Sequence, residues 1–172
     1  MIIRQERPSD YDEVYELVRT SFSTVSDSDG TEPDYLNEIR MKDTFIPELS
    51  LVAENEDGIL IGQIVLYKTT VSTQRGGLVE LLLSPLCVHP DYFRRGIARA
   101  LMEKSFEIAK NLGYTAIFLC GDPLFYRKIG FVPTYEHNIY HITDMEGKAE
   151  WCMVRELVSG ALRNISGTVD IV

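Results

Sequence analysis

The sequence predicts one mixed α/β domain of the α+β type, covering residues 1–172, with a β-sheet at its centre. The chain has 172 residues, of which 45% are hydrophobic and 25% charged, as is typical of a globular domain with a sizeable core. Apolar runs of strand length alternate with segments whose apolar residues recur at helical spacing. Turns rich in Gly, Asn and Asp join several of the strand-length runs, and this favours antiparallel neighbours.

The N-terminal part is predicted to hold one strand and two helices. Residues 2–6 form the strand, and Ser9, with Asp12 three positions on, is expected to cap the first helix. The buried stripe of that helix consists of Val14, Leu17, Val18 and Phe22. Residues 23–33 are polar and rich in turn formers, so we expect a mobile loop there, followed by a short helix over residues 34–43.

Three antiparallel strands are predicted next. The first two cover residues 49–54 and 59–67, and the sequence Asn55-Glu56-Asp57-Gly58 between them is a hairpin turn. A turn at residues 74–77 leads into the third strand, which ends at Val88.

The C-terminal part begins with a helix. Its apolar residues recur at helical spacing from Ile97, and Gly113 is placed to end it. A strand is expected at residues 115–120, and two late strands at residues 139–142 and 152–157.

The turn between the third strand and this helix carries the strongest functional signal. Pro90 stops the strand, and a glycine, Gly96, lies at the start of the helix. A helix N-terminus offers unpaired N–H groups and a partial positive charge, and Gly96 lets a phosphate approach the backbone. Positive charge is added by Arg94, Arg95 and Arg99. The turn therefore predicts a phosphate-bearing cofactor, with solvated surface arginines as the alternative; neither G-x-x-x-x-G-K-[ST] nor G-x-G-x-x-G is present.

Two segments in order resemble the Gcn5-related N-acetyltransferase (GNAT) superfamily. The first runs from Val88 to Ala98 and reads V-H-P-x-Y-x-x-R-G-I-A; the second runs from Phe125 to Phe131 and reads F-Y-x-x-x-G-F. Gly121-Asp122-Pro123 before the tyrosine is similar to one subgroup of that superfamily. The resemblance covers nearly the whole chain and implies a single acetyltransferase domain with a mixed, mostly antiparallel sheet flanked by helices.

The resemblance also implies the cofactor and the residues that bind it. Acetyl-CoA is the expected co-substrate, with its pyrophosphate gripped mainly by backbone amides of the turn. The cofactor-binding residues carried over are Leu86, Cys87, Val88, Arg94, Arg95, Gly96, Ile97, Ala98 and Arg99. Phe93 departs from the family pattern, which usually has Gln or Arg there, and puts the affinity for the cofactor in doubt.

Chemistry at the thioester is assigned by the same resemblance. Backbone amides around Leu86 and Val88 face the thioester where this strand splays from its neighbour, and Pro85 fits a break in pairing because it lacks an N–H. Tyr126 matches the tyrosine that faces the sulfur, so we expect it to protonate the leaving thiolate; the alternative is a core aromatic residue. At unperturbed pKa values that proton transfer is uphill by roughly 2 kcal/mol.

The general base is left open. The candidates are Glu80, Glu54, Asp122 and a chain of water molecules. The three histidines, His89, His137 and His141, receive no role, because none has a partner visible in the sequence.

Charge and cysteine content exclude several classes of protein. The net charge is −9, and residues 1–60 carry five Lys or Arg against fifteen Asp or Glu, which disfavours nucleic-acid binding. The three cysteines include no C-x-x-C pair, so neither a zinc site nor a disulfide framework is expected; Cys87 and Cys120 are interpreted as small core residues, with a nucleophilic role as the lesser alternative. No apolar run reaches the ~20 residues of a membrane span, and no signal peptide is recognised, so we expect a cytoplasmic protein that binds no membrane.

Two functional hypotheses follow. The first is an acetyl-CoA-dependent N-acetyltransferase that acts on a primary amine by direct transfer in a ternary complex. The second is a catalytically idle module that binds CoA or acyl-CoA as a sensor or partner protein. The acceptor, a small molecule or a protein, is expected to be cationic because of the acidic N-terminal segment, although acidic surfaces also serve solubility. No metal is expected, and a homodimer is left open.

Overall fold

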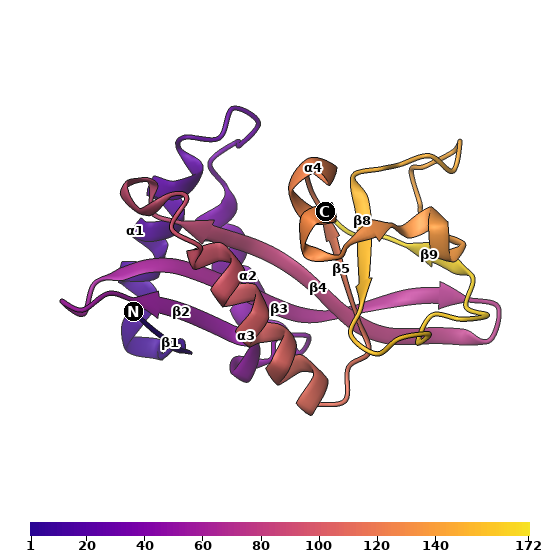
Figure 1. Ribbon diagram of the computed structural model, residues 1–172, viewed down its shortest axis with the longest axis horizontal. Coiled ribbons are helices and arrows are strands. Elements are labelled where there is room, and N and C mark those ends of the chain that lie inside the picture. The colour runs from indigo at the N-terminus through magenta and orange to yellow at the C-terminus, as the bar shows by residue number, and fades with distance from the viewer. The chain divides into compact units, whose positions relative to one another are not determined.

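The computed structural model describes residues 1–172, and Figure 1 shows its helices and strands. The helices are α1 (Tyr11–Phe22), α2 (Glu32–Arg40), α3 (Ile97–Asn111) and α4 (Pro123–Tyr126). The strands are β1 (Ile2–Gln5), β2 (Ser50–Glu54), β3 (Leu60–Thr73), β4 (Gly76–Val88), β5 (Ala116–Cys120), β6 (Val132–Pro133), β7 (Ile139–His141), β8 (Cys152–Glu156) and β9 (Gly167–Val169). The strands pair in both directions and mostly antiparallel, which confirms the predicted fold class.

The chain forms two compact units. The first unit comprises Met1–Tyr67 and Ser84–Ile108, and the second comprises Lys68–Leu83 and Ala109–Val172. The two long strands, β3 and β4, and the helix α3 each contribute residues to both units. No helix has the length and apolar character needed to cross a membrane.

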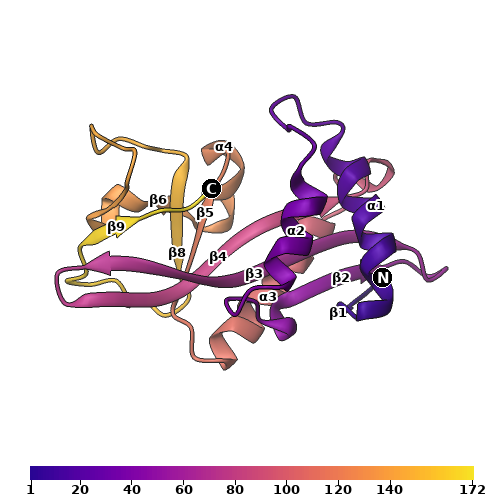
Figure 2. The same ribbon diagram turned by 180° about the vertical axis from the view of Figure 1, so that it is seen from behind.

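In the first unit, helices cover both faces of an antiparallel sheet. β2 pairs with β1, with Ala53 opposite Ile3, and also with β3, with Leu51 opposite Ile64. α3 lies over one face of these strands in Figure 1, and α1 and α2 lie over the other face in Figure 2, which shows the chain from behind. The fully buried residues between α1, α2 and the sheet are Val14, Val18, Leu36, Ile39, Leu49 and Val52.

A buried ion pair ties α2 to the start of the chain in this unit. Arg40 pairs with Glu6, and their side chains are only 4% and 1% exposed. Ser50 donates a hydrogen bond of 2.7 Å to the same carboxylate, and the ring of Tyr11 lies 4.0 Å from the guanidinium carbon. Because both charges are satisfied by partners, this pair holds α2 in place, and removing one member would leave an uncompensated charge in the core.

In the second unit, the strand order is β4-β5-β8-β6. β5 runs parallel to β4, with Ile117 opposite Leu81, and antiparallel to β8, with Phe118 opposite Val154. β9 pairs with β7 and with the end of β3. The core of this unit contains Ile117, Phe118, Phe131, Met153 and Val154, all less than 2% exposed.

Several predicted boundaries are wrong. Ser9 does not cap the first helix: it lies in a 3-10 turn over Pro8–Asp10, which is closed by a hydrogen bond of 2.7 Å from the Arg7 N–H to the Asp10 carboxylate, and α1 begins at Tyr11 with Asp10 as its N-cap. The expected loop ends earlier than residue 33, since α2 begins at Glu32 with a proline in its first turn, where the missing N–H has no helical partner in any case.

Candidate active site

The predicted phosphate turn is a tight connection between β4 and α3, and two of its residues have left-handed backbone conformations. After β4, residues Pro90–Tyr92 form a 3-10 turn, and then Arg94 and Gly96 adopt positive φ angles of 61° and 78°. The carbonyl of Gly96 accepts the first helical hydrogen bond, from the Ala100 N–H at 3.0 Å, so Gly96 is the N-cap of α3. A glycine cap has no side chain, and the N–H groups of the first helical turn, Ile97 to Arg99, therefore have no helical acceptor.

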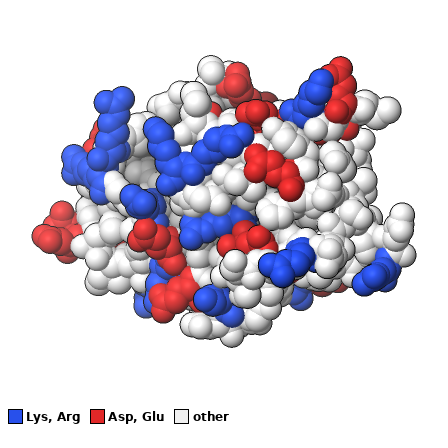
Figure 3. All heavy atoms as spheres, turned by 45° about the vertical axis from the view of Figure 1, so that its right-hand side comes forward, with Lys and Arg blue, Asp and Glu red and all other residues white.

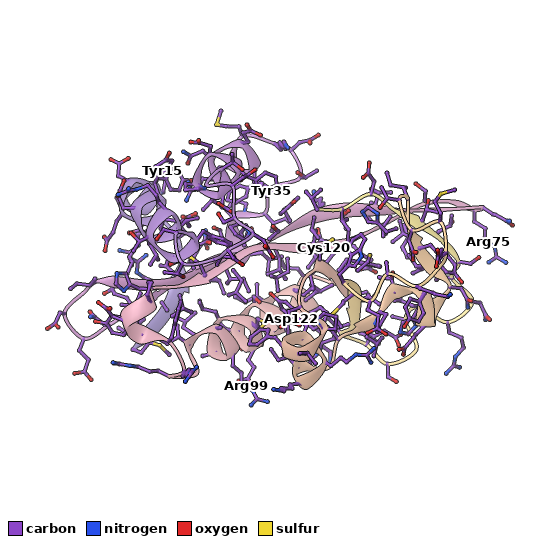
Figure 4. All side chains as sticks on the ribbon, turned by 90° about the horizontal axis from the view of Figure 1, so that it is seen from above. Tyr15, Tyr35, Arg75, Arg99, Cys120 and Asp122 are labelled. Carbon is purple, nitrogen blue, oxygen red and sulfur yellow. The ribbon has the colours of Figure 1, made fainter.

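The space around this N-terminus is open. A Cβ atom built on Gly96 would meet nothing within 4 Å. Arg94 is exposed, Arg95 lies 4.9 Å from the centre of the Tyr92 ring, and Arg99 pairs with Glu103 at 3.1 Å while two-thirds of its side chain is exposed. Figure 4 shows Arg99 extending away from the ribbon. The turn thus combines free backbone donors, positive charge and room for a ligand.

Basic side chains are also grouped on the molecular surface, although the net charge is negative. On the face drawn in Figure 3, Lys and Arg side chains gather at the upper left, and acidic side chains are scattered between and around them. The charge of −9 is therefore not spread evenly, and an anionic ligand meets local positive charge despite it.

Phe93, the residue that departs from the family pattern, offers no side-chain hydrogen bond to a ligand at this turn. Phe93 is 49% exposed and has no side-chain donor. Tyr92, to which the sequence assigned no role, supports the turn by stacking under Arg95. The contact lies within the distance of about 6 Å that cation–π pairs need, and no pattern in the sequence marks it.

A missing side chain in β3 determines how close α3 lies to the sheet. A Cβ atom on Gly62 would come within 3.0 Å of Ile97 Cγ2 and Leu101 Cδ1, and within 3.3 Å of the Cys87 carbonyl oxygen. Ile97 and Leu101 are 4% and 0% exposed. The first turns of α3 therefore pack directly onto the backbone of β3, and this contact fixes the helix that carries the phosphate turn.

The end of β4 presents backbone donors away from β3. The His89 N–H donates to the Ile61 carbonyl at 2.9 Å, and successive N–H groups along a strand point to opposite edges. The N–H groups of Val88 and Leu86 therefore point away from β3. Both side chains are half-buried, whereas Cys87 between them is buried, and burial raises the pKa of its thiol to about 12. Cys87 is a core residue and a poor nucleophile.

Tyr126 lies in the second unit, at the end of the short helix α4. Its ring makes edge contacts with Phe125 and Phe131, at centroid distances of 4.9 and 5.6 Å. It also covers Gly121, where an added Cβ would lie 2.8 Å from Cδ2 of the tyrosine. Burial, together with the negative charge of Asp122, raises the pKa of Tyr126 to about 12, so its hydroxyl keeps its proton at physiological pH.

All three candidate carboxylates have partners in the structure. Glu80 is buried and accepts bonds from the Thr115 and Ala116 N–H groups, each at 3.0 Å, and from the Thr115 hydroxyl. Asp122, labelled in Figure 4, caps α4 by accepting from the Leu124 N–H at 2.9 Å. Glu54 pairs with Arg4 at 2.8 Å. Each carboxylate therefore holds the fold locally, and both oxygens of Glu80 are engaged, whereas Asp122 and Glu54 each use one oxygen in these contacts.

The three histidines also have polar neighbours in the structure, and Nε2 of His137 lies 4.0 Å from a carboxylate oxygen of Glu156. His141 is buried, and its Nε2 lies 2.7 Å from the Ile171 carbonyl, so Nε2 carries the proton and Nδ1 accepts from the Thr143 N–H at 3.1 Å. Nδ1 of His89 accepts from the Asp91 N–H at 3.3 Å. No group of three or more His, Cys, Asp or Glu side chains is placed to hold a metal ion.

Comparison with known proteins identifies the family. Residues 47–133 match the acetyltransferase (GNAT) domain family. The chain is also 30% identical over 170 residues to the uncharacterised N-acetyltransferase YhbS of Escherichia coli K12, and the match covers 99% of this chain and 95% of that protein.

Solved structures of related proteins also match. The crystal structure of E. coli YhbS in complex with CoA matches with a TM-score of 0.83 at 28% identity, over 99% of this chain and 89% of that one. A GNAT acetyltransferase from Brucella melitensis in complex with acetyl-CoA matches with a TM-score of 0.69 at 28% identity, over 76% and 81% of the two chains. Serotonin N-acetyltransferase of Mesocricetus auratus is 33% identical over 139 residues, which are 72% of this chain and 64% of that protein.

These matches define a class of protein, the acyl-CoA-dependent N-acyltransferases with the GNAT fold. This chain belongs to the GNAT family and is an N-acetyltransferase of that family. The resemblance to the GNAT superfamily inferred from the sequence motifs is therefore confirmed.

Proposed function

We propose that the protein transfers an acetyl group from acetyl-CoA to a primary amine by direct transfer in a ternary complex. The observation that carries the proposal is the open N-terminus of α3, where a glycine cap leaves backbone donors free beside exposed arginines. The E. coli and Brucella relatives, crystallised with CoA and with acetyl-CoA, support the choice of ligand.

The turn is proposed to bind the pyrophosphate of acetyl-CoA. The N–H groups of Ile97 to Arg99 donate to the phosphate oxygens, and the arginines add long-range attraction. Acetyl-CoA at 100 times its dissociation constant should then stabilise the protein by about 2.7 kcal/mol. S-acetyl-pantetheine, which lacks the phosphates, should give a much smaller thermal shift at the same concentration, and equal shifts would contradict an anion site.

At the thioester, the donors are proposed to come from β4. The N–H groups of Leu86 and Val88 point away from β3, which makes them available to the carbonyl oxygen and the pantetheine amides. Cys87 contributes its backbone only, since its side chain is buried.

Tyr126 is proposed to donate its proton to the leaving thiolate. With a tyrosine pKa of about 12 and a thiol pKa of about 8.5, complete transfer is uphill by about 5 kcal/mol, more than for an ordinary tyrosine. The raised pKa therefore favours a role in which the Tyr126 hydroxyl stabilises the developing thiolate by a hydrogen bond before the proton moves.

The proton of the amine is proposed to leave through water. Glu80 is buried with both carboxylate oxygens engaged, and Asp122 and Glu54 each hold a structural hydrogen bond or ion pair, which favours water over these side chains as the proton acceptor. An amine with a pKa near 10.4 is mostly protonated at neutral pH, and the rate should rise with pH as its free base is formed.

The acceptor is proposed to be a cationic amine. Asp27 and Asp29 are exposed between α1 and α2, and hydrogen bonds from Thr31 lower the pKa of Asp29, so that this carboxyl stays ionised. Glu32 follows in the first turn of α2. The name of the hamster relative, an enzyme acting on serotonin, adds support for a primary amine acceptor.

The decisive experiment is thiol release from acetyl-CoA across a panel of amines: an arylalkylamine, a polyamine, an aminoglycoside and a lysine peptide. We expect at least one cationic amine to react, with a KM that rises with salt. Neutralising Asp27, Asp29 and Glu32 together should raise that KM severalfold and leave the KM for acetyl-CoA unchanged. Binding of CoA without thiol release for any amine would instead indicate an idle CoA-binding module.

A further inference from the structure

Two cysteines face each other in the second unit. Cys120 ends β5 and Cys152 begins β8, and the register of the antiparallel ladder places them directly opposite. Both are free thiols. Thirty-two positions separate them in the chain, so this pairing is visible only once the strand register is known.

The backbone geometry at this pair suits a disulfide. The Gly121 N–H donates to the Trp151 carbonyl at 2.9 Å, which makes the next pair along a hydrogen-bonded one. Hydrogen-bonded and non-hydrogen-bonded pairs alternate in an antiparallel ladder, so Cys120 and Cys152 occupy a non-hydrogen-bonded pair, with Cα atoms about 4.5 Å apart. This separation lies within the range of about 4.4–6.8 Å found for disulfides. The two thiols already share a hydrogen bond.

The surroundings of the two thiols differ. Cys120 is partly exposed and can meet a reagent, and its sulfur lies 3.6 Å from the Ile171 carbonyl; the hydrogen bond that it donates to Cys152, together with burial, raises the pKa of its thiol. Cys152 is buried; the hydrogen bond from Cys120 and a second one from the Thr134 hydroxyl, at 3.5 Å, lower the pKa of its thiol. A thiolate is the nucleophilic form of cysteine, and Cys87, with its raised pKa, lacks this activation.

We propose that Cys120 and Cys152 form a dithiol site that reacts with low-molecular-weight disulfides and closes reversibly into an intramolecular disulfide. In the first step the Cys120 thiol attacks one sulfur of a disulfide RSSR: the S–S bond of RSSR breaks, the Cys120 proton passes to the departing sulfur, and a mixed disulfide and one RSH are formed. The Cys152 thiolate then attacks the Cys120 sulfur, forms the Cys120–Cys152 bond and releases the second sulfur as RS⁻, which takes up a proton. The two protein thiols lose two protons and two electrons, and RSSR is reduced to two molecules of RSH.

This site adjoins the segment that carries Tyr126, so oxidation should also affect turnover. Gly121 directly follows Cys120 in the chain, and the ring of Tyr126 packs on Gly121. A new covalent bond one residue away displaces this packing and lowers kcat severalfold, which dithiothreitol should reverse. This second effect rests on the proposed function, whereas formation of the disulfide does not.

The test uses the whole protein and glutathione disulfide as the probe. After incubation, intact-mass measurement should show a loss of two hydrogen atoms with no retained glutathione, and thiol titration of the denatured protein should find one free cysteine instead of three. Peptide mapping should link Cys120 to Cys152. Three remaining thiols, or a stable glutathione adduct in the wild-type protein, would contradict the proposal.

Two variants sharpen the result. Cys152→Ala should keep one glutathione on Cys120, because no second thiol is present to release it. Cys87→Ala is the matched control and should oxidise at the wild-type rate, leaving no free thiol. An adduct on Cys87 or linkage through Cys87 would overturn the assignment. A disulfide that forms without any change in kcat would refute only the link to Tyr126, and a disulfide in a protein that acetylates no amine would leave the site intact while refuting the proposed function.

Discussion

Two turns of this molecule have the same order of elements, strand, turn and helix, but differ in how the N-terminus of the helix is capped. Each follows a parallel-paired strand, β4 or β5, and each leads into a helix, α3 or α4. In the first turn the helix is capped by Gly96, which has no side chain, so the N–H groups of the helix remain free. In the second turn Asp122 caps the helix and takes up the Leu124 N–H.

The comparison bears on the proposed phosphate site, because a helix N-terminus can bind an anion only where no acceptor of the protein occupies its N–H groups. α3 has fifteen residues and an open cap, and therefore offers donors to a ligand. α4 has four residues, and the Asp122 side chain accepts a hydrogen bond from its first turn. This short helix holds the Tyr126 side chain against Gly121. In the proposed function, the first turn binds the cofactor and the second positions the Tyr126 side chain.

The largest expected effect comes from closing the open turn. Gly96→Glu puts a carboxylate beside the free donors of α3, and we expect CoA binding to fall below detection by calorimetry. Gly113→Glu is the matched control, because Gly113 also has a positive φ, of 94°, and an added Cβ there also meets nothing within 4 Å. Both variants should lose similar thermal stability, and only the first should lose CoA. Equal CoA affinity in the two variants would show that α3 binds no phosphate.

The next largest effect concerns the positioned side chain. Tyr126→Phe should lower kcat by roughly 10²–10⁴-fold, the usual contribution of one acid–base group, with the affinity for acetyl-CoA nearly unchanged. A tyrosine is protonated below its pKa, so a donor with a pKa of about 12 keeps its proton as the pH rises, whereas an ordinary one would lose it near about pH 10. The kcat/KM profile of the wild-type protein should therefore show no fall at about pH 10. Turnover in the Phe variant close to that of the wild type would make Tyr126 a packing residue.

A smaller effect is expected from disturbing the surface on which Tyr126 rests. Gly121→Ala places a methyl group against the tyrosine ring, and a shift of about 1 Å can reduce turnover about a hundredfold. CoA affinity, measured by calorimetry, should not change. Gly77→Ala is the control in the same unit: its added Cβ would lie 2.8 Å from the Thr70 side chain, so it crowds a neighbour of another kind. If both variants lose turnover alike, general destabilisation explains the loss.

The smallest effect tests whether Asp122 is a cap or a base. Asp122→Asn keeps an acceptor for the Leu124 N–H, so stability and kcat should stay within about twofold of the wild type. Asp122→Ala removes the cap and should cost about 1 kcal/mol of the free energy of unfolding, measured by urea denaturation. A fall in kcat of about 10²-fold or more in the Asn variant would instead identify Asp122 as the general base.

The open turn could be predicted from the sequence because everything that defines it is local. Pro90, Gly96 and the helical spacing from Ile97 lie within a dozen residues, and the structure forms the strand, turn and helix as expected. The short strands β6 and β9 could not be predicted, because two or three residues give no periodicity and their pairing depends on distant partners. β3 runs six residues beyond the predicted end, since its polar residues from Lys68 onward gain a partner, β9, from the end of the chain.

Side-chain roles that depend on strand register could not be predicted from the sequence either. Glu80 looked available as a base, but β5 begins beside it and takes up its carboxylate through Thr115 and Ala116. From the sequence, Cys120 is interpreted as a core residue and Cys152 only as part of a late strand, and the ladder places them opposite each other. Sequence patterns predict structure that depends on residues close together in the chain. These contacts depend instead on which strands pair and in which register.

The close packing at Gly62 has a consequence for how such a site evolves. The helix that carries the phosphate turn touches the backbone of β3 because one methyl group is missing there, with Ile97 and Leu101 filling the space. A larger residue at position 62 fits only if position 97 or 101 becomes smaller at the same time. Positions 62, 97 and 101 are therefore expected to change together in related chains. The arginines of the turn are under no such constraint and are expected to change independently.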